Sequence, residues 1–468
     1  MSHLAGSEAF GRALTDTLII YLDLDQSALG PTPPEVGAAV CRLLGLRGPD
    51  IALAPEKETV DDIYAIAHAD LDRFQRNDPS GRAALIFVAY VSTFFHEARH
   101  VHDLLSTGFG LDILAAEFNY YQNALPLVGH LRKWQVSTSL SVPMPVAVDH
   151  PAIQSWTPRA ARLIEGYTTL ASRLERAGAP DRGIYGWMSN IHLLEASAGT
   201  VQLDIAHDLF GDEGIVLFDQ LVRRGASARK YMWLINDFVE LIQQRSKARE
   251  QIGRMMAFLL WTSLQGGRGD SSEPGLSPVA FFHAAADFVS RRADRANNVE
   301  QMQLLLDEFC TLWKLPLSAV TLTANEKRVQ MRTGKFAQGW QAIDEAAPAH
   351  FADIFVGLSD AHLRLTKQIQ TIPEIYFVGR FYSHAILLGH LPGLRVDFKF
   401  GDINHTAFTP GQPCLDPAVW DKAALYAAIL SVLLKGRCTF PIPYLEDRAF
   451  RFMSDELGLR LKDRNFDF

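Results

Sequence analysis

The sequence predicts a mainly α-helical protein with many packed helices and a minor β component near the N-terminus and around residues 394–400. Apolar residues recur at intervals of three and four through most of the chain, as in helices with one buried face. Turn and capping residues separate these patterns, and only two short segments have the composition of strands. A chain of 468 residues, 48% hydrophobic and 21% charged, has the size and composition of a globular protein with a large core.

The N-terminal segment, residues 1–56, is expected to contain one short strand. Residues 17–22 (TLIIYL) are rich in β-branched and aromatic side chains, and a proline-rich turn follows at residues 30–34. A second strand is predicted at residues 394–400, where apolar and polar residues alternate.

Helical patterns account for most of the remaining chain and end at recognisable breaks. Asn77-Asp-Pro-Ser-Gly81 supplies capping and turn residues before a long helix, which Thr107-Gly108 is expected to end. The next helix is expected to end before Pro126, and residues 136–151, with several prolines, are predicted to form an extended loop. The predicted helices span residues 60–74, 81–106, 112–125, 158–177, 186–209, 230–264, 278–292, 299–312, 349–370 and 417–434.

A polar, glycine-rich loop at residues 266–275 is the best candidate for an internal boundary. It separates a helical region at residues 57–265 from a second, mostly helical region at residues 276–468. Alternatively, both regions belong to one compact domain.

Composition argues against several classes of function. The net charge of −8, with no strongly basic segment, argues against nucleic-acid binding. The longest apolar run, residues 83–95, is shorter than the roughly 20 residues that cross a bilayer, so we expect no membrane association. The four cysteines form no CxxC pair, and the N-terminus lacks the pattern of a signal peptide. We therefore expect a cytoplasmic location.

The most informative feature is the HExxH sequence His96-Glu97-Ala98-Arg99-His100, which lies within a predicted, otherwise apolar helix. Two histidines four residues apart lie on one helix face, where both imidazoles can bind the same metal ion. Glu97 is placed to hold or deprotonate a metal-bound water. The alternative is a helix that reaches the surface, where these residues form a solvated face.

The motif resembles the active-site helix of the zincin metallopeptidases. The resemblance covers this helix and one further helix. It implies that zinc is the cofactor, that His96 and His100 bind it, and that Glu97 is the general base in the hydrolysis of a peptide or amide bond. Zincins usually have an uncharged residue where Arg99 stands and an apolar residue where His102 stands. Metal binding tolerates both, because Arg99 lies beside the ligand face and His102 nearly behind it.

Two glutamates compete to be the third metal ligand. Glu195 is a lone carboxylate in a helix of apolar and small residues, a string that resembles the zinc-ligand helix of the glutamate zincins. Glu117, 17 residues after His100, is the runner-up. We favour Glu195, because an isolated buried carboxylate needs a partner and small neighbours allow close helix packing. Asp103 shares the face of both histidines and is expected to orient a ligand imidazole by a hydrogen bond.

Three other functions remain open. The same residues, His96, His100 and Glu195, match the facial triad of non-haem Fe(II) oxygenases, in which iron replaces zinc. Glu97-x-x-His100 is half of a di-iron carboxylate motif, with Asp204-Ile-Ala-His207 as an imperfect second half. A helical interaction protein with a residual metal site is the non-catalytic alternative. For the enzyme, we expect a peptide or small-molecule substrate.

Overall fold

The computed structural model describes most of the chain. The described residues are 11–14, 18–23, 31–48, 59–146, 190–224, 249–265, 278–315, 348–400, 403–436 and 443–461.

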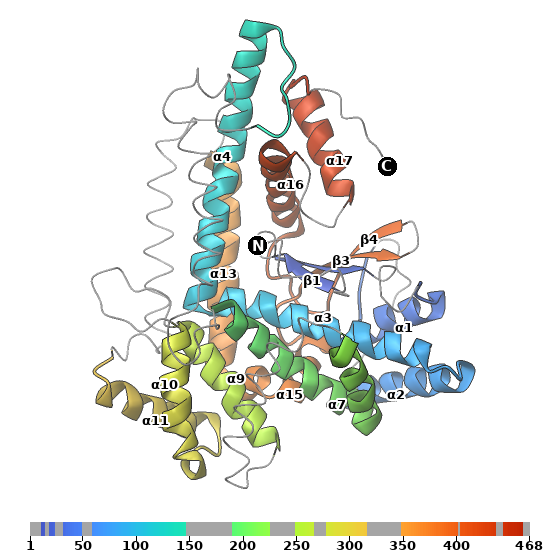
Figure 1. Ribbon diagram of the computed structural model, residues 1–468, viewed down its shortest axis with the longest axis vertical. Coiled ribbons are helices and arrows are strands. Elements are labelled where there is room, and N and C mark those ends of the chain that lie inside the picture. The colour runs from blue at the N-terminus through green and yellow to red at the C-terminus, as the bar shows by residue number, and fades with distance from the viewer. Residues whose placement is uncertain are drawn as a thin grey trace.

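Helices dominate these residues, which confirms the mainly α prediction (Figure 1). The first half contains α1 (Pro34–Leu44), α2 (Val60–Asn77), α3 (Arg82–Ser106), α4 (Gly108–Thr138), α7 (Asn190–Arg224) and α9 (Arg249–Gln265). The second half contains α10 (Pro278–Ser290), a short 3-10 turn η1 (Ala293–Arg295), α11 (Val299–Leu312), α13 (Pro348–Thr371), α14 (Glu374–Phe377), α15 (Gly379–Leu387), α16 (Pro417–Lys435), α17 (Pro443–Arg451) and a π-helical turn η3 (Phe452–Glu456).

Four strands form one small sheet with the order β1-β2-β3-β4. The strands are β1 (Gly11–Leu14), β2 (Ile19–Asp23), β3 (Arg395–Phe400) and β4 (Ile403–Phe408). The outer pairs are antiparallel, whereas β2 and β3 run parallel, with Ile19 opposite Arg395. The two predicted strands therefore lie side by side, although almost the whole chain separates them in sequence.

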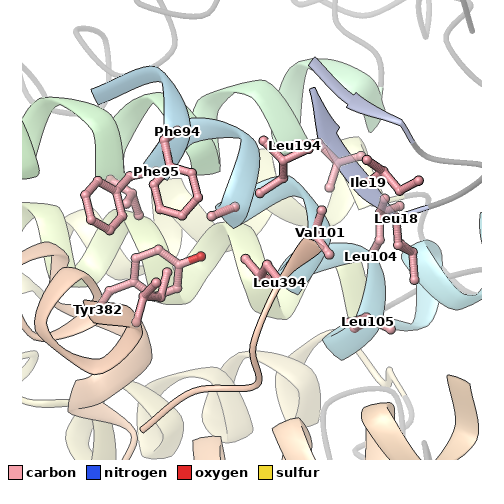
Figure 2. Packing of buried hydrophobic residues seen from close by; sticks show 14 of the residues in the cluster. Leu18, Ile19, Phe94, Phe95, Val101, Leu104, Leu105, Leu194, Tyr382 and Leu394 are labelled. Carbon is pink, nitrogen blue, oxygen red and sulfur yellow. The ribbon is translucent and has the colours of Figure 1, made fainter. Parts of the chain in front are cut away.

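The central element is α3, nearly all of whose residues are buried. It crosses the molecule beneath the sheet, with α7 alongside it (Figure 1). Its Phe94 and Phe95 belong to the same buried cluster as Leu194 of α7 and Tyr382 of α15, and Figure 2 shows Tyr382 close to the two phenylalanine rings. Each such buried side chain contributes about 1.5–3 kcal/mol of transfer free energy. The motif is thus embedded in the core.

A tight corner follows α3 where the sequence predicts a stop. Thr107 ends α3 and caps α4, because its side-chain oxygen accepts a hydrogen bond from Gly110 N at 3.0 Å. Gly110 has to be a glycine, since a Cβ there would lie 2.4 Å from Leu104 Cα.

Several predicted helices match the structure and others need correction. The helix at residues 299–312 is confirmed at both ends. The helix expected to end before Pro126 continues to Thr138, because buried residues beyond the proline, such as Leu131, hold the backbone helical. The prolines at residues 33 and 34 begin α1 rather than only forming a turn, since proline suits the first helical position. The predicted helix at 158–177 and the loop at 266–275 lie outside the described residues.

One described helix, α16, is long and apolar enough to cross a membrane by length and composition, with a mean hydropathy of 1.4. In the protein, 67% of that window is buried against other elements. A helix buried in a protein core has the same length and composition, so this property alone is weak evidence for a membrane span.

Candidate metal site

Three side chains from two helices bring their ligand atoms together. His96 and His100 come from α3 and Glu195 comes from α7. The two imidazole Nε2 atoms are 3.1 Å apart, and the Glu195 carboxylate oxygens lie 3.3 Å from His96 Nε2 and 3.6 Å from His100 Nε2. Three ligands of a tetrahedral zinc ion with bonds of 2.0–2.1 Å would have donor atoms about 3.3 Å apart. The three groups can therefore hold one metal ion.

Local sequence explains why the two helices approach so closely. His96 and His100 are one turn apart on α3, and their rings meet edge to face. On α7, Glu195 is followed by Ala196, Ser197 and Ala198, which are fully buried. These small side chains allow the backbone of α7 to lie near α3, so that the short Glu195 side chain reaches both imidazoles.

The site is buried, so the interpretation of the motif as a solvated helix face is wrong. The side chains of His96, His100 and Glu195 are only 9, 12 and 16% exposed, and Arg99 and His102 are fully buried. Buried charged groups need partners of opposite charge or a metal.

The site's electrostatics favour ionised Glu195. Burial alone would raise the pKa of Glu195, but His100 and His96 together hold it well below its usual range. Burial disfavours the charged form of His100 and so lowers its pKa. The nearby Glu195 carboxylate has the opposite effect, and the net result is that the pKa of His100 rises to about 9. Without a metal, the group forms a buried ion pair; a metal would take the place of the proton.

Glu97 has a partner that the sequence did not indicate. Its Oε2 accepts a hydrogen bond from the backbone N–H of Ala13 at 2.5 Å. Ala13 lies in β1, the edge strand of the sheet, which packs against α3. No strand was predicted there, because Gly11–Leu14 has only four residues and no β-branched side chain.

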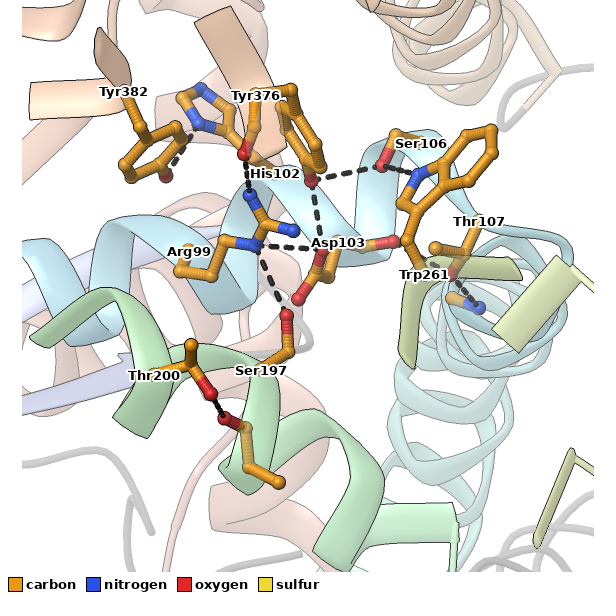
Figure 3. Close-up of polar contacts among 12 residues, drawn as sticks. Arg99, His102, Asp103, Ser106, Thr107, Ser197, Thr200, Trp261, Tyr376 and Tyr382 are labelled. Atoms are coloured by element: carbon orange, nitrogen blue, oxygen red, sulfur yellow. Dashed lines mark hydrogen bonds and ion pairs between the residues drawn. The ribbon is translucent and has the colours of Figure 1, made fainter. Parts of the chain in front are cut away.

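Asp103 faces a different neighbour from the one predicted. It lies 3.1 Å from Arg99 Nε and accepts a hydrogen bond from Tyr376 Oη at 2.8 Å. Asp103 does contribute to raising the pKa of His100 through its charge. Its hydrogen bonds, however, join α3 to α14 (Figure 3).

Two of the other ligand candidates, Asp204 and His207, lie outside this group of three. Glu117 belongs to α4, but its side chain is outside the described residues. Asp204 packs against Gly379 and Gly253, and His207 is half exposed beside Asp212. Neither Asp204 nor His207 belongs to the group of three ligands.

The second half of the chain supplies two buried tyrosines near the motif. Tyr376 and Tyr382 are buried behind the ligand helix. Tyr376 Oη donates to Asp103 and Tyr382 Oη pairs with His102 Nδ1 at 2.8 Å.

No family model, curated protein or solved structure matches this chain. Of the resemblance to zincins, the described residues bear out a group of three side chains, His96, His100 and Glu195, that could hold a metal ion. Two imidazoles and one carboxylate suit both catalytic zinc and ferrous iron.

Proposed function

We propose that the protein is a zinc-dependent hydrolase that cleaves a peptide or amide bond with an activated water molecule. The observation that carries the proposal is the convergence of His96, His100 and Glu195, with Glu97 next to His96 on α3. Catalytic zinc sites commonly have three protein ligands of these types and leave one position open.

The residues would divide the work as follows. A zinc ion at the site would polarise a substrate carbonyl and make water more acidic. His96 and His100 would bind it through Nε2, and Glu195 through a carboxylate oxygen. Glu97 is oriented by Ala13 N–H at Oε2, so we assign its Oε1 as the atom that takes the proton and returns it to the leaving amine.

The first test of this proposal is Glu97→Gln. The variant keeps the size of the side chain and can still meet the Ala13 N–H, but it is no longer a base. We expect it to retain one zinc per chain and to lose at least about a hundredfold in turnover of a peptide library with zinc present, the usual contribution of a general base.

Loss of the metal in Glu97→Gln would contradict this assignment. It would make Glu97 a ligand and favour the di-iron arrangement. Full activity in the variant would show that Glu97 is not the general base.

A non-haem iron oxygenase is the second candidate, because the same three residues form a 2-His-1-carboxylate triad. Iron bound in the purified protein, with turnover that depends on oxygen, would support the oxygenase and contradict the hydrolase. Zinc bound in the purified protein, with hydrolysis that does not depend on oxygen, would support the hydrolase and contradict the oxygenase.

A further inference from the structure

Arg99 is the charged departure from the zincin motif, and its side chain is fully buried. A guanidinium remains protonated in proteins, so its burial requires partners that balance the charge and accept its N–H groups. Its carboxylate partner, Asp103, lies on α3 itself, and its other partners come from α7, α14 and α15.

The contacts of Arg99 are close and varied (Figure 3). Its Nε donates to Ser197 Oγ at 3.1 Å and lies 3.1 Å from Asp103 Oδ1. Its Nη1 donates to the backbone carbonyl of Tyr376 at 2.7 Å. Its Cζ lies over the Tyr376 ring, 3.8 Å from the ring centre, and 5.4 Å from that of Tyr382. The guanidinium is thus held both in its plane and on its face.

These contacts join the two helices that carry the metal ligands. Arg99 lies between His96 and His100 on α3, and Ser197 is two positions after Glu195 on α7. A bond from Arg99 to Ser197 therefore fixes the segment of α7 that presents Glu195. The ligand contacts of 3.3 and 3.6 Å across the same interface depend on that spacing.

A layer of hydrogen bonds holds the guanidinium from behind. Tyr376 Oη donates to Asp103, Ser106 Oγ lies 3.0 Å from Tyr376 Oη, and Trp261 Nε1 donates to Ser106 Oγ. Because each member is buried, a shift of Arg99 would leave several polar groups without partners in the core.

We infer that Arg99 is a positioning residue for the metal site, whose guanidinium holds α7 against α3 so that Glu195 stays within reach of both imidazoles. The inference rests on the proposed metal-binding function and adds the residue that sets the geometry of the third ligand. It gives a physical reason for an arginine in the motif. Lysine would keep the charge but lose the flat stacking on Tyr376 and the fork of N–H donors.

The test uses Arg99→Met, Arg99→Lys and Ser197→Ala in the full chain. Zinc affinity is measured by competition with a chelator, and ligand geometry by the visible absorption of the cobalt(II)-loaded protein. Loss of a residue that orients a ligand typically costs roughly 10- to 100-fold in metal affinity, so we expect at least about tenfold for Arg99→Met. Arg99→Lys and Ser197→Ala should weaken zinc binding less. All three cobalt spectra should move toward that of Glu195→Ala.

Arg395→Met is the matched control. Arg395 is also a buried arginine, 2% exposed, but it lies in β3 and pairs with Asp397 at 2.9 Å and Asp421 at 2.7 Å, neither of which is a proposed metal ligand. Its replacement should lower the melting temperature while leaving zinc affinity and the cobalt spectrum unchanged.

Wild-type affinity and spectrum in folded Arg99→Lys and Ser197→Ala would overturn the inference, and these two milder variants decide it if Arg99→Met does not fold. Weaker zinc binding and an altered cobalt spectrum in Arg395→Met would also overturn the inference. They would show that the loss of any buried arginine disturbs the metal site. A wild-type protein that binds neither zinc nor cobalt(II) would overturn the proposed function and the inference with it, before any variant is compared.

Discussion

His102 illustrates how single residues of α3 depart from the zincin pattern for reasons of packing. It is buried, with Nδ1 2.8 Å from Tyr382 Oη and Nε2 3.4 Å from the carbonyl of Pro392. Since only a nitrogen that carries hydrogen can donate to a carbonyl, Nε2 is protonated and Nδ1 accepts from Tyr382. Burial lowers the pKa of His102 to about 3, and the charge of Arg99 acts in the same direction. The imidazole is therefore neutral in the folded protein.

This neutral histidine predicts a pH dependence of stability. Below pH 6.5 the unfolded chain protonates His102 and the folded chain does not, until the pH reaches about 3. Its contribution to the free energy of unfolding is thus fully present above pH 6.5 and falls by about 1.4 kcal/mol per pH unit below it. Urea unfolding between pH 7 and pH 5 should show a shallower fall for His102→Gln than for the wild type.

His207→Gln is the control for this experiment, because the His207 side chain is 51% exposed. It should keep the wild-type slope. Equal slopes for His102→Gln and the wild type would show that His102 titrates normally in the folded protein.

A second prediction at the residue scale separates the competing carboxylates. Glu195→Ala removes an atom that lies 3.3 Å from His96 Nε2, so zinc affinity should fall by more than the roughly 10- to 100-fold typical of an indirect partner. Glu117→Ala should leave the affinity unchanged. Chelator competition on both variants checks this, and loss of zinc from Glu117→Ala alone would make Glu117 the ligand.

The proposed metal ligands can be predicted from residue types and spacing, but the buried residues that surround and hold them cannot. The i, i+4 histidines and a lone carboxylate among small residues are enough to nominate His96, His100 and Glu195. Several partners of Arg99 and His102, among them Tyr376 and Tyr382, lie more than 270 positions away in the sequence. No local pattern encodes such contacts.

Among the elements, the edge strand β1 has the most direct link to the chemistry. In an antiparallel strand the N–H and C=O of one residue point to the same side. Because Ala13 N–H donates to Glu97, it points away from β2, and the sheet edge holds the proposed base. The sequence predicted the neighbouring β2 from its apolar, β-branched composition, but a four-residue strand has too little pattern to be found.

The role of β1 is open to a backbone test. Ala13→Pro removes the N–H that binds Glu97 without removing a hydrogen bond to β2. We expect turnover to fall while the zinc content stays at the wild-type value. Steady-state kinetics with metal analysis checks this.

Ala13→Ser is the control, because it keeps the N–H and should keep most of the activity. Normal turnover in Ala13→Pro would mean that Glu97 does not depend on the strand.

At the scale of the whole molecule, segments that are far apart in the sequence meet around α3. The pairing of β2 with β3 joins residues 19–23 to residues 395–399, and α14 and α15 supply the tyrosines behind the motif. The mainly α class was predictable, because each helix shows its own periodicity. The sheet pairing was not, since it depends on packing between segments about 370 residues apart. The division into residues 1–56, 57–265 and 276–468 stays a prediction.

The shared core gives a prediction about that division. A fragment of residues 57–265 contains all three proposed ligands but lacks Ala13, Tyr376 and Tyr382. We expect it to be poorly folded and to bind zinc far more weakly than the full chain, since Arg99 and His102 would lose buried partners. Circular dichroism and chelator competition check this, and a cooperatively folded fragment with wild-type affinity would contradict it.

We propose that His96, His100 and Glu195 together hold one zinc ion. The most direct test of this proposal is the metal content of the full-length protein purified without added metal, compared with a His96→Ala, His100→Ala double variant prepared in parallel. We expect about one zinc per wild-type chain and essentially none in the variant. Wild-type protein that holds no metal under any loading condition, or a double variant that retains its zinc, would contradict it.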